Sequence, residues 1–520
     1  MGRKIALFCA LIGVVAFLAA PAYAEVQNIK VSGELTAMGV YRNNYDLENS
    51  RCLISGGEYS NRIAEDQDSF FFSVAKLRVD ADLTDNVSAC VSIGNAREWD
   101  VVGGASEDII LDLAYVTLKE MLYSPLTLIV GRQELEYGTG LVVGRGRYQD
   151  STGIAPGTTK YDDLLPFHGY DAVRAILDYD PWTLDLFAVK ITELDDDANM
   201  APAAANDDVT DAGNDTLQGN QQEDQDVYGA NLGYKFNKYD AEMEGYFLYK
   251  RDESYALNID LLHCTSNERV FDENKVYTGG LRASFVPVEN LTMGGEFAFQ
   301  WGEIEDVNAG PDDLPLTRDR DAMLGNAMAN YDFANVRFTP SLGVEYLYLS
   351  GEEAANEGDF EFWDSMLRGR QLSTIRDCLE NLYTTNDPDD TSGWTNQHTL
   401  KAMSSMDLGE LVDGLSVDIA YLYYWFDEEP IDGVDDEIGS EVNLKVTYDY
   451  TEDVEFAVNG AWFMPGDYYD SSVNTAQNVP VAITGDPLIN ASPTDAANAR
   501  TGRLAHDSAV SVIGSCKVTF

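Results

Sequence analysis

The most regular feature of the chain is an alternation between apolar and polar residues. In residues 74–83 (VAKLRVDADL), one parity is wholly apolar and the other, from Lys76 to Asp82, is wholly charged. Because successive side chains of a strand point to opposite faces, this period of two predicts a β-strand with one dry and one wet face. The same pattern recurs along the chain and no helical period competes with it for long. The chain is therefore predicted to be antiparallel β throughout.

Segments of this kind, separated by turn signals, predict about eighteen strands. They are placed at residues 27–42, 70–83, 86–99, 108–119, 125–136, 169–179, 181–193, 226–237, 239–251, 274–287, 289–303, 320–332, 335–350, 398–408, 413–427, 437–450, 453–464 and 506–520.

The connections between these strands alternate in length. Short ones, such as 84–85, 237–238 and 451–452, alternate with long ones at 43–69, 137–168, 194–225, 252–273, 304–319, 351–397 and 465–505. Tight turns at one end and long loops at the other are typical of an outer-membrane barrel. The predicted fold is all-β, a transmembrane antiparallel barrel of about eighteen strands. Its short turns would be periplasmic, its long loops extracellular, and its apolar parity would face lipid.

Both ends of the chain agree with export to the outer membrane. Residues 1–24 combine Arg3 and Lys4 with an apolar run and an Ala-Tyr-Ala cleavage site, so they are predicted to be a signal peptide. Residues 25–520 would then form the barrel domain. The alternative for residues 1–24, a retained anchor, requires a longer apolar run. The final strand ends in Phe520, which resembles the signal read by the barrel-assembly machinery; an ordinary edge strand is the alternative.

The composition of the chain limits the classes of partner that the protein can bind. The chain has 34 basic and 89 acidic residues and a net charge of −55, which disfavours nucleic acid because phosphate would be repelled. The 29 Tyr, 21 Phe and 7 Trp favour an ordered structure over an acidic disordered one. The expected surroundings are outer-membrane lipid and lipopolysaccharide. Five scattered cysteines follow residue 24 and form no metal motif, which leaves at most a loop disulfide: Cys52, Cys90, Cys264, Cys378 and Cys516.

A barrel of this width is too wide for side chains to fill, so it should enclose water, with constriction supplied by long loops or by lumen side chains. Charges of the polar parity would then set the selectivity of the channel. An alternative interpretation is that they only pair across neighbouring strands. The pore-lining candidates are Lys76, Arg78, Asp80, Asp82, Arg132, Asp171 or Arg174, Glu242, Glu244, Arg282, Glu296, Arg337, Glu345, Asp418, Glu441 and Lys445.

Catalysis and metal binding find little support. The chain carries neither HExxH nor GxSxG, and no catalytic residue is predicted among its histidines, His168, His263, His398 and His506. No cofactor is expected. The acidic loops match no EF-hand, although calcium bound by loop carboxylates stays open as an alternative to solvated acid.

Three blocks resemble the alginate export family of outer-membrane porins. They are LTLIVGRQELEYGTGLVVG (126–144), HGYDAVRAILDYD (168–180) and IGSEVNLKVTYDYTEDVEFAVNGAWFMPGDYY (438–469). The resemblance implies a monomeric eighteen-stranded barrel whose charged lumen conducts an anionic polysaccharide or smaller solutes. It also implies lumen positions for Arg132, Asp171, Arg174 and Glu441. After Tyr-Gly, this chain has Thr139 and Gly140 where the family usually has an acid and an arginine.

Two hypotheses follow. The first is a channel for hydrophilic, anionic or sugar-like solutes, with alginate-type polysaccharide export as one form of it. The second is a closed structural or adhesive surface barrel with acidic, calcium-binding loops, whose lumen would be plugged by residues 43–69 or 351–397.

Overall fold

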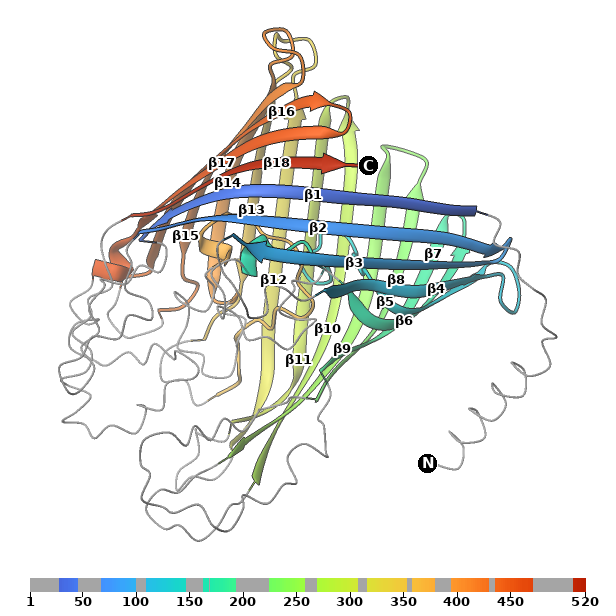
Figure 1. The fold of residues 1–520 in the computed structure, drawn as a ribbon. Coiled ribbons are helices and arrows are strands. Elements are labelled where there is room, and N and C mark those ends of the chain that lie inside the picture. The colour runs from blue at the N-terminus through green and yellow to red at the C-terminus, as the bar shows by residue number, and fades with distance from the viewer. Residues whose placement is uncertain are drawn as a thin grey trace, which may run out of the picture.

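The protein is a closed antiparallel β-barrel in which every strand pairs with its two neighbours in sequence, and β1 closes the ring onto β18 (Figure 1). The computed structural model describes residues 28–44, 67–99, 109–145, 162–167, 169–192, 224–257, 269–306, 316–352, 358–378, 394–429, 435–470 and 508–520. The predicted signal peptide, residues 1–24, lies outside these ranges and stays a prediction. Among the described residues, no helix is long and apolar enough to cross a membrane.

Eighteen strands lie within the described part of the chain, which confirms the predicted fold class. They are β1 (Asn28–Asn43), β2 (Gln67–Thr84), β3 (Val87–Glu98), β4 (Ile110–Lys119), β5 (Leu126–Gln133), β6 (Tyr170–Tyr179), β7 (Trp182–Thr192), β8 (Asp224–Phe236), β9 (Ala241–Leu257), β10 (Arg269–Val288), β11 (Leu291–Asp306), β12 (Leu316–Asp332), β13 (Ser341–Leu349), β14 (Gln397–Asp407), β15 (Leu415–Trp425), β16 (Glu437–Thr451), β17 (Val454–Pro465) and β18 (Ala509–Thr519).

Connections are sorted by end, as predicted. Eight connections of two to eight residues, from 85–86 to 452–453, lie at one end, and the long ones lie at the other. Strand β1 begins and β18 ends at the short-turn end, where Gly33 and Phe520 exchange two backbone hydrogen bonds of 2.8 and 3.0 Å. The long-connection end is accordingly the extracellular side of an outer-membrane barrel.

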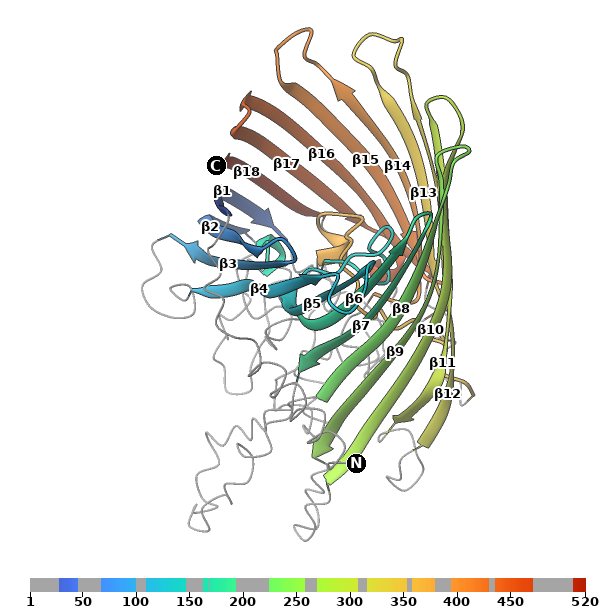
Figure 2. The ribbon, with the colours of Figure 1, turned by 90° about the vertical axis from the view of Figure 1, so that its right-hand side faces the viewer.

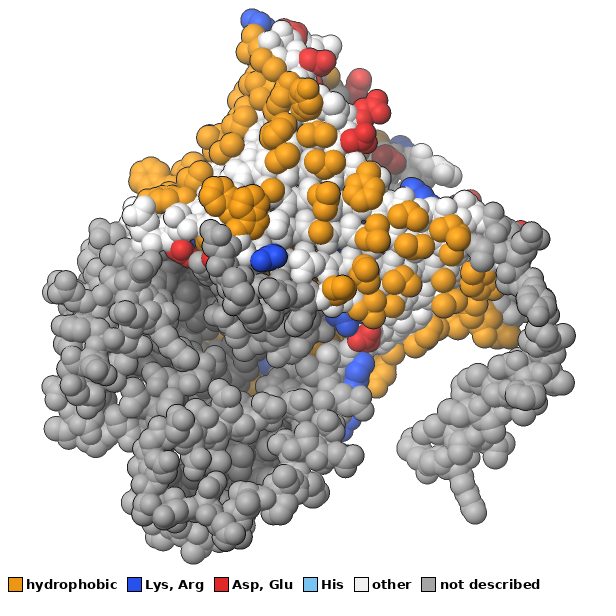
Figure 3. All heavy atoms as spheres, viewed as in Figure 1, with side chains coloured by type: hydrophobic (Ala, Val, Ile, Leu, Met, Phe, Trp, Pro, Cys, Tyr) orange, Lys and Arg blue, Asp and Glu red, His pale blue; other side chains and the backbone are white. Residues whose placement is uncertain are grey.

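The apolar parity of the strands covers the outer wall. On β2, Phe71 is 59% exposed, whereas its neighbours Phe70 and Phe72 point inward and are buried. Figure 3 shows hydrophobic side chains spread over the outer face of the strands. This arrangement suits lipid, which replaces water as the solvent of the outer wall.

The inward-facing side chains of the strands are polar near the short turns but apolar near the long connections. Near the long connections, inward residues of many strands join one buried cluster, for example Val227, Leu248, Val276 and Leu347. A second cluster joins Phe70, Phe72 and Val74 to Leu165 and Phe167. The apolar half of the lumen is therefore filled by protein side chains.

Candidate functional site: the lumen constriction

Two segments from long connections lie inside the ring of strands (Figure 2). Residues 134–145 follow β5 and are called the first inserted segment; residues 358–378 follow β13 and are called the second. They pair with each other through the hydrogen bonds Gly144 N to Leu367 O (2.8 Å) and Leu367 N to Val142 O (3.1 Å). The two segments therefore form one constriction across the lumen.

The crossing of the two segments requires glycine. A Cβ added at Gly369 would lie 2.2 Å from the carbonyl oxygen of Arg145, and one added at Gly144 would lie 2.7 Å from the nitrogen of Gly369. Real Cβ atoms are not found so close to backbone atoms. Glycine at both positions lets the two backbones approach to hydrogen-bonding distance.

Glu441 on β16 holds the end of the second segment. Its carboxylate is fully buried and accepts three backbone hydrogen bonds of 3.0 Å, from the N–H groups of Thr374, Ile375 and Arg376. These donors open the short 3₁₀ helix η4 (Arg376–Cys378), whose first N–H groups have no partner within the helix. Within the segment, Asp377 accepts from Leu372 N (2.5 Å) and Ser373 N (3.2 Å), which closes the turn.

Asp364 anchors the middle of the second segment to the wall. Its carboxylate lies 2.9 Å from Lys250 Nζ on β9. Its backbone exchanges two hydrogen bonds of 2.8 Å with the side-chain amide of Gln300 on β11. Burial alone would raise the pKa of Asp364, but the charges of Lys250 and Arg320 outweigh it and hold this pKa below the ordinary value.

The lowered pKa gives a testable pH dependence. A carboxylate whose pKa falls on folding stabilises the docked segment above its unfolded pKa, and this stabilisation is lost only as pH falls through the lower, folded value. Acidification from about pH 7 to about pH 5, still above the ordinary Asp pKa of about 3.9, is expected to leave the Lys250–Asp364 anchor intact. Single-channel current recorded across this range should stay constant, whereas Lys250→Met should make the channel noisier at every pH. Parental noise in Lys250→Met would show that this ion pair does not hold the segment.

A further set of polar contacts fixes the segment between its two ends. Arg370 Nη2 lies 2.7 Å from Glu345 on β13, and Asn326 on β12 donates to the other oxygen of the same carboxylate at 3.0 Å. Lys401 on β14 donates to the carbonyl of Leu372 at 2.8 Å. Strands β9, β11, β12, β13, β14 and β16 thus contribute to docking.

Aromatic and aliphatic side chains fill the space between the segment and the wall. Trp363, Leu367 and Ile375 are buried, as is Trp394, whose ring lies 4.2 Å from the guanidinium carbon of Arg368. The docked segment is therefore part of a packed interior.

A third segment, residues 162–167, covers the lumen side of β1 to β3. Arg42 Nη2 lies 2.6 Å from Asp163, and Lys76 Nζ donates to the carbonyl of Pro166 at 2.9 Å while pairing with Asp112 at 2.9 Å. Leu165 and Phe167 pack onto the inward phenylalanines of β2. Lys76 faces the lumen, as predicted, but its ammonium is engaged by this segment.

Several predicted residues do lie on the inner wall. Arg78 and Asp80 form a two-bonded ion pair at 2.9 Å, with side chains 40% and 37% exposed. Lys445 on β16 is exposed, and its backbone lies opposite Asp418 in the register. Because these residues share the inward parity and reach water, they are available to a passing solute; their role in conduction stays a prediction.

Arg174 and Arg282 face inward, but the first inserted segment covers them. Arg174 lies 2.5 Å from Asp185 and its guanidinium stands 5.3 Å from the centre of the Tyr137 ring. Arg282 lies 2.5 Å from Glu244, and its side chain packs against Gly138. These pairs match the interpretation in which strand charges neutralise one another across neighbouring strands. Glu441, described above, is likewise buried under a segment.

The expectation that Arg132 and Asp171 face the lumen is wrong. The two residues are opposite each other in the β5–β6 register and form an ion pair at 3.2 Å. They share the parity of Val130 and Val173, which are 42% and 46% exposed on the outer wall. Their pair therefore lies on the outside of the barrel. The motif resemblance identified the residues without fixing the parity.

The placement of Arg337 on a strand is also wrong. The predicted strand 335–350 begins only at Ser341, because residues 333–340 form the turn between β12 and β13. Arg337 lies in this turn, well exposed, and pairs at 3.0 Å with Glu410 of the next turn. It belongs to the short-turn rim and not to the inner wall.

The acidic cluster closest to a metal-site geometry lies at the long-connection end. Asp435, Glu437 and Asp467 place one carboxylate oxygen each within 4.8 Å of one another. Acids grouped in this way commonly occur without an ion, so calcium binding stays a prediction. Of the cysteines, Cys90 and Cys516 are free, while Cys52, Cys264 and the side chain of Cys378 lie outside the described residues.

Comparison with known proteins decides the family. The profile of the alginate export family matches residues 65–482, which includes both inserted segments and strands β2 to β17. The chain belongs to the alginate export family. Members of this family are channels, and this one is an outer-membrane channel for solutes in a Gram-negative bacterium. The closed adhesive barrel is not favoured.

Solved porins share the fold at low sequence identity. OpdL of Pseudomonas aeruginosa is 10% identical, with a TM-score of 0.50 over 95% of this chain and 99% of that chain. OccK2 (OpdF) of the same organism is 11% identical, with a TM-score of 0.49 over 95% and 98% of the two chains. The likeness to OpdL shows the fold alone and nothing of a substrate. No curated protein matches the sequence.

Proposed function

We propose that this alginate export family channel conducts anionic, uronate-like saccharides, alginate-type polysaccharide among them. The observation that carries the proposal is the exposure of cations on one sector of the inner wall. The chain has 89 acidic and only 34 basic residues. Nevertheless Arg78 on β2, Lys445 on β16 and Lys517 on β18 all face the lumen and reach water.

The acids beside these cations allow a solute to exchange contacts. Asp80 pairs with Arg78, and Glu34 lies 2.9 Å from Lys517. Exposed ion pairs of this kind are worth only about 0–1 kcal/mol, so a carboxylate of the solute can replace the acid at little cost. Binding would be strong enough for entry and weak enough for release, which conduction requires.

The charge of Lys445 is expected to set ion selectivity. Lys445→Glu exchanges a cation for an anion on the inner wall beside Asp418, so the reversal potential in a salt gradient should move towards cation selectivity. Arg132→Ala is the matched control, because it removes an arginine from the outer wall and should leave the reversal potential unchanged. Planar-bilayer recording measures both. Equal reversal potentials for the parent and Lys445→Glu would remove Lys445 from the conduction path.

The remaining properties of the channel are part of the same proposal. The protein would act as a monomer, be inserted by the barrel-assembly machinery, and carry out no catalysis. Of the four histidines the described part of the chain contains only His398, which stacks on Trp425 at 4.9 Å and hydrogen-bonds Tyr346 and Asp427.

A further inference from the structure

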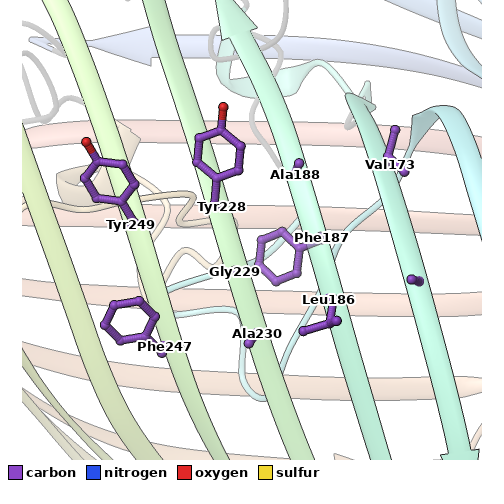
Figure 4. Close-up of a pocket in the computed structure, with 10 residues that line it drawn as sticks. Val173, Leu186, Phe187, Ala188, Tyr228, Gly229, Ala230, Phe247 and Tyr249 are labelled. Atoms are coloured by element: carbon purple, nitrogen blue, oxygen red, sulfur yellow. The ribbon is translucent and has the colours of Figure 1, made fainter. Parts of the chain in front are cut away.

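An apolar groove of about 390 Å³ opens on the outer wall across β6 to β9 (Figure 4). It exists because small outward side chains alternate with large ones in the register. Ala230 lies between Leu186 and Phe247 across the three strands β7, β8 and β9, and Ala188 lies between Val173 and Tyr228 one row further along. Its lining is apolar, so the groove suits a hydrocarbon chain.

A row of aromatic side chains borders the groove on its long-connection side. Tyr228, Tyr249 and Tyr277 are direct neighbours in the register, with ring centres 6.3 and 4.8 Å apart, and Trp301 continues the row. Figure 4 shows the hydroxyls of Tyr228 and Tyr249 directed away from Phe247, the way that β7 runs from Leu186 to Ala188. Tyr and Trp concentrate where hydrocarbon meets headgroups, so this row marks the outer interface.

A row of charged side chains lies two residues beyond the groove and its aromatic border. Asp171, Lys190, Asp226, Arg251 and Lys275 are successive neighbours in the register across β6 to β10. All have the parity of the exposed outer-wall residues, such as Tyr228 and Phe247. Within the row, Lys190 Nζ lies 3.3 Å from Asp226 and forms an ion pair with it.

The balance of charge in this row is unusual for the chain. It holds three cations and two acids, whereas the whole chain has 34 basic and 89 acidic residues. On β11 and β12 the row continues with the exposed acids Glu303 and Asp319. On β5, at the other end of the row, Arg132 lies opposite Asp171 and adds a fourth cation. The surplus of cations therefore covers β5 to β10, the strands on and beside the groove.

We infer that this wall binds one phosphorylated glycolipid of the outer leaflet, lipopolysaccharide, with an acyl chain in the groove and a phosphate on Lys190, Arg251 and Lys275. The order along the strands is hydrocarbon groove, aromatic interface, cation row, which is the order of acyl chain, interface and phosphate in such a lipid. The row lies at the long-connection end, on the side of the leaflet that carries lipopolysaccharide. Ammonium and guanidinium groups are the side chains that bind phosphate most strongly.

Two variants test the two halves of the inferred site. Ala230→Trp fills the groove between Leu186 and Phe247, and Arg251→Ala with Lys275→Ala removes two cations without touching the groove. The controls are Ala402→Trp, on an exposed outer-wall position of β14, and Arg337→Ala, in a short turn. Purified protein in detergent is titrated with rough lipopolysaccharide, and bound lipid is counted by native mass spectrometry alongside the unfolding temperature.

The parent protein is expected to retain one lipid and to be stabilised by lipopolysaccharide more than by its dephosphorylated form or by phosphatidylethanolamine. Both variants should weaken retention by about tenfold or more, Ala230→Trp because the acyl chain loses its groove and the double variant because the phosphate loses two charge-assisted contacts. Both controls should behave as the parent. Retention unchanged in the double variant, or equal stabilisation by all three lipids, would overturn the inference. Single-channel conductance should be the same in all five proteins, which separates this result from the proposed function.

Discussion

Glu441→Ala is expected to release the second inserted segment. The single-channel conductance and the noise of the current should both increase. The carboxylate of Glu441 is the acceptor for three consecutive backbone N–H groups that have no other described acceptor. Each buried donor left without a partner costs about 1–3 kcal/mol. The loss falls on segment docking, because the β15–β16 and β16–β17 ladders around Glu441 do not depend on its side chain.

Single-channel recording and limited proteolysis would check this result. Glu441→Gln keeps one acceptor oxygen but presents an amide donor to the third N–H, so its conductance should lie between those of the parent and Glu441→Ala. Glu455→Ala is the control, because it removes a half-buried carboxylate from the lumen side of β17, beside the 452–453 turn. If Glu441→Ala shows parental current and parental resistance to protease, the three hydrogen bonds do not govern docking.

Replacement of residues 358–378 by a short Gly-Ser linker is expected to increase single-channel conductance severalfold. This change removes Trp363, Leu367 and η4, and leaves the first inserted segment without its partner. A ring of eighteen strands encloses a lumen too wide for wall side chains to close. The wall itself should persist, because its strands are held by hydrogen bonds that do not involve the segment.

The strand content of the shortened protein is checked by circular dichroism, and its folding by the shift in gel mobility on heating. A shortened protein that folds but conducts no better than the parent would show that residues 358–378 are not the main barrier.

The wall of this barrel could be predicted from sequence because strand formation and the direction of each side chain depend on residues that are close together in the chain. Alternation of apolar and polar residues fixes strand and face together, and turn residues fix the ends, so most predicted strand ends lie within about four residues of the observed ones. The larger differences are the end of β9 (251 predicted, Leu257 observed), the start of β10 (274 predicted, Arg269 observed) and the start of β13 (335 predicted, Ser341 observed). The late start of β13 has a clear cause: residues 335–340 continue the strand pattern in a turn that is longer than its neighbours.

The constriction could not be predicted, because it depends on contacts between residues far apart in the chain. Nothing local indicates that Gly144 meets Gly369, or that Glu441 receives the N–H groups of η4. Lys250 and Gln300 gave no distinct signal, since other polar residues such as Glu244 and Glu296 share the inward parity of the same strands. The errors at Arg132 and Asp171 have a different origin, because a motif identifies residues but parity decides which side of the wall they occupy.

The two-sided apolar character of the strands near the long connections has a consequence for tolerance to mutation. Phe72 and Phe71 are adjacent, yet one is surrounded by protein and the other by acyl chains. Truncating Phe72 would leave a void that neighbouring atoms cannot fill, as in any water-soluble enzyme. Truncating Phe71 would be compensated by fluid hydrocarbon flowing into the gap. Substitutions of apolar residues should therefore destabilise the barrel more at inward positions than at lipid-facing ones. The sequence should consequently diverge fastest on the lipid-facing surface, although that surface is the most hydrophobic.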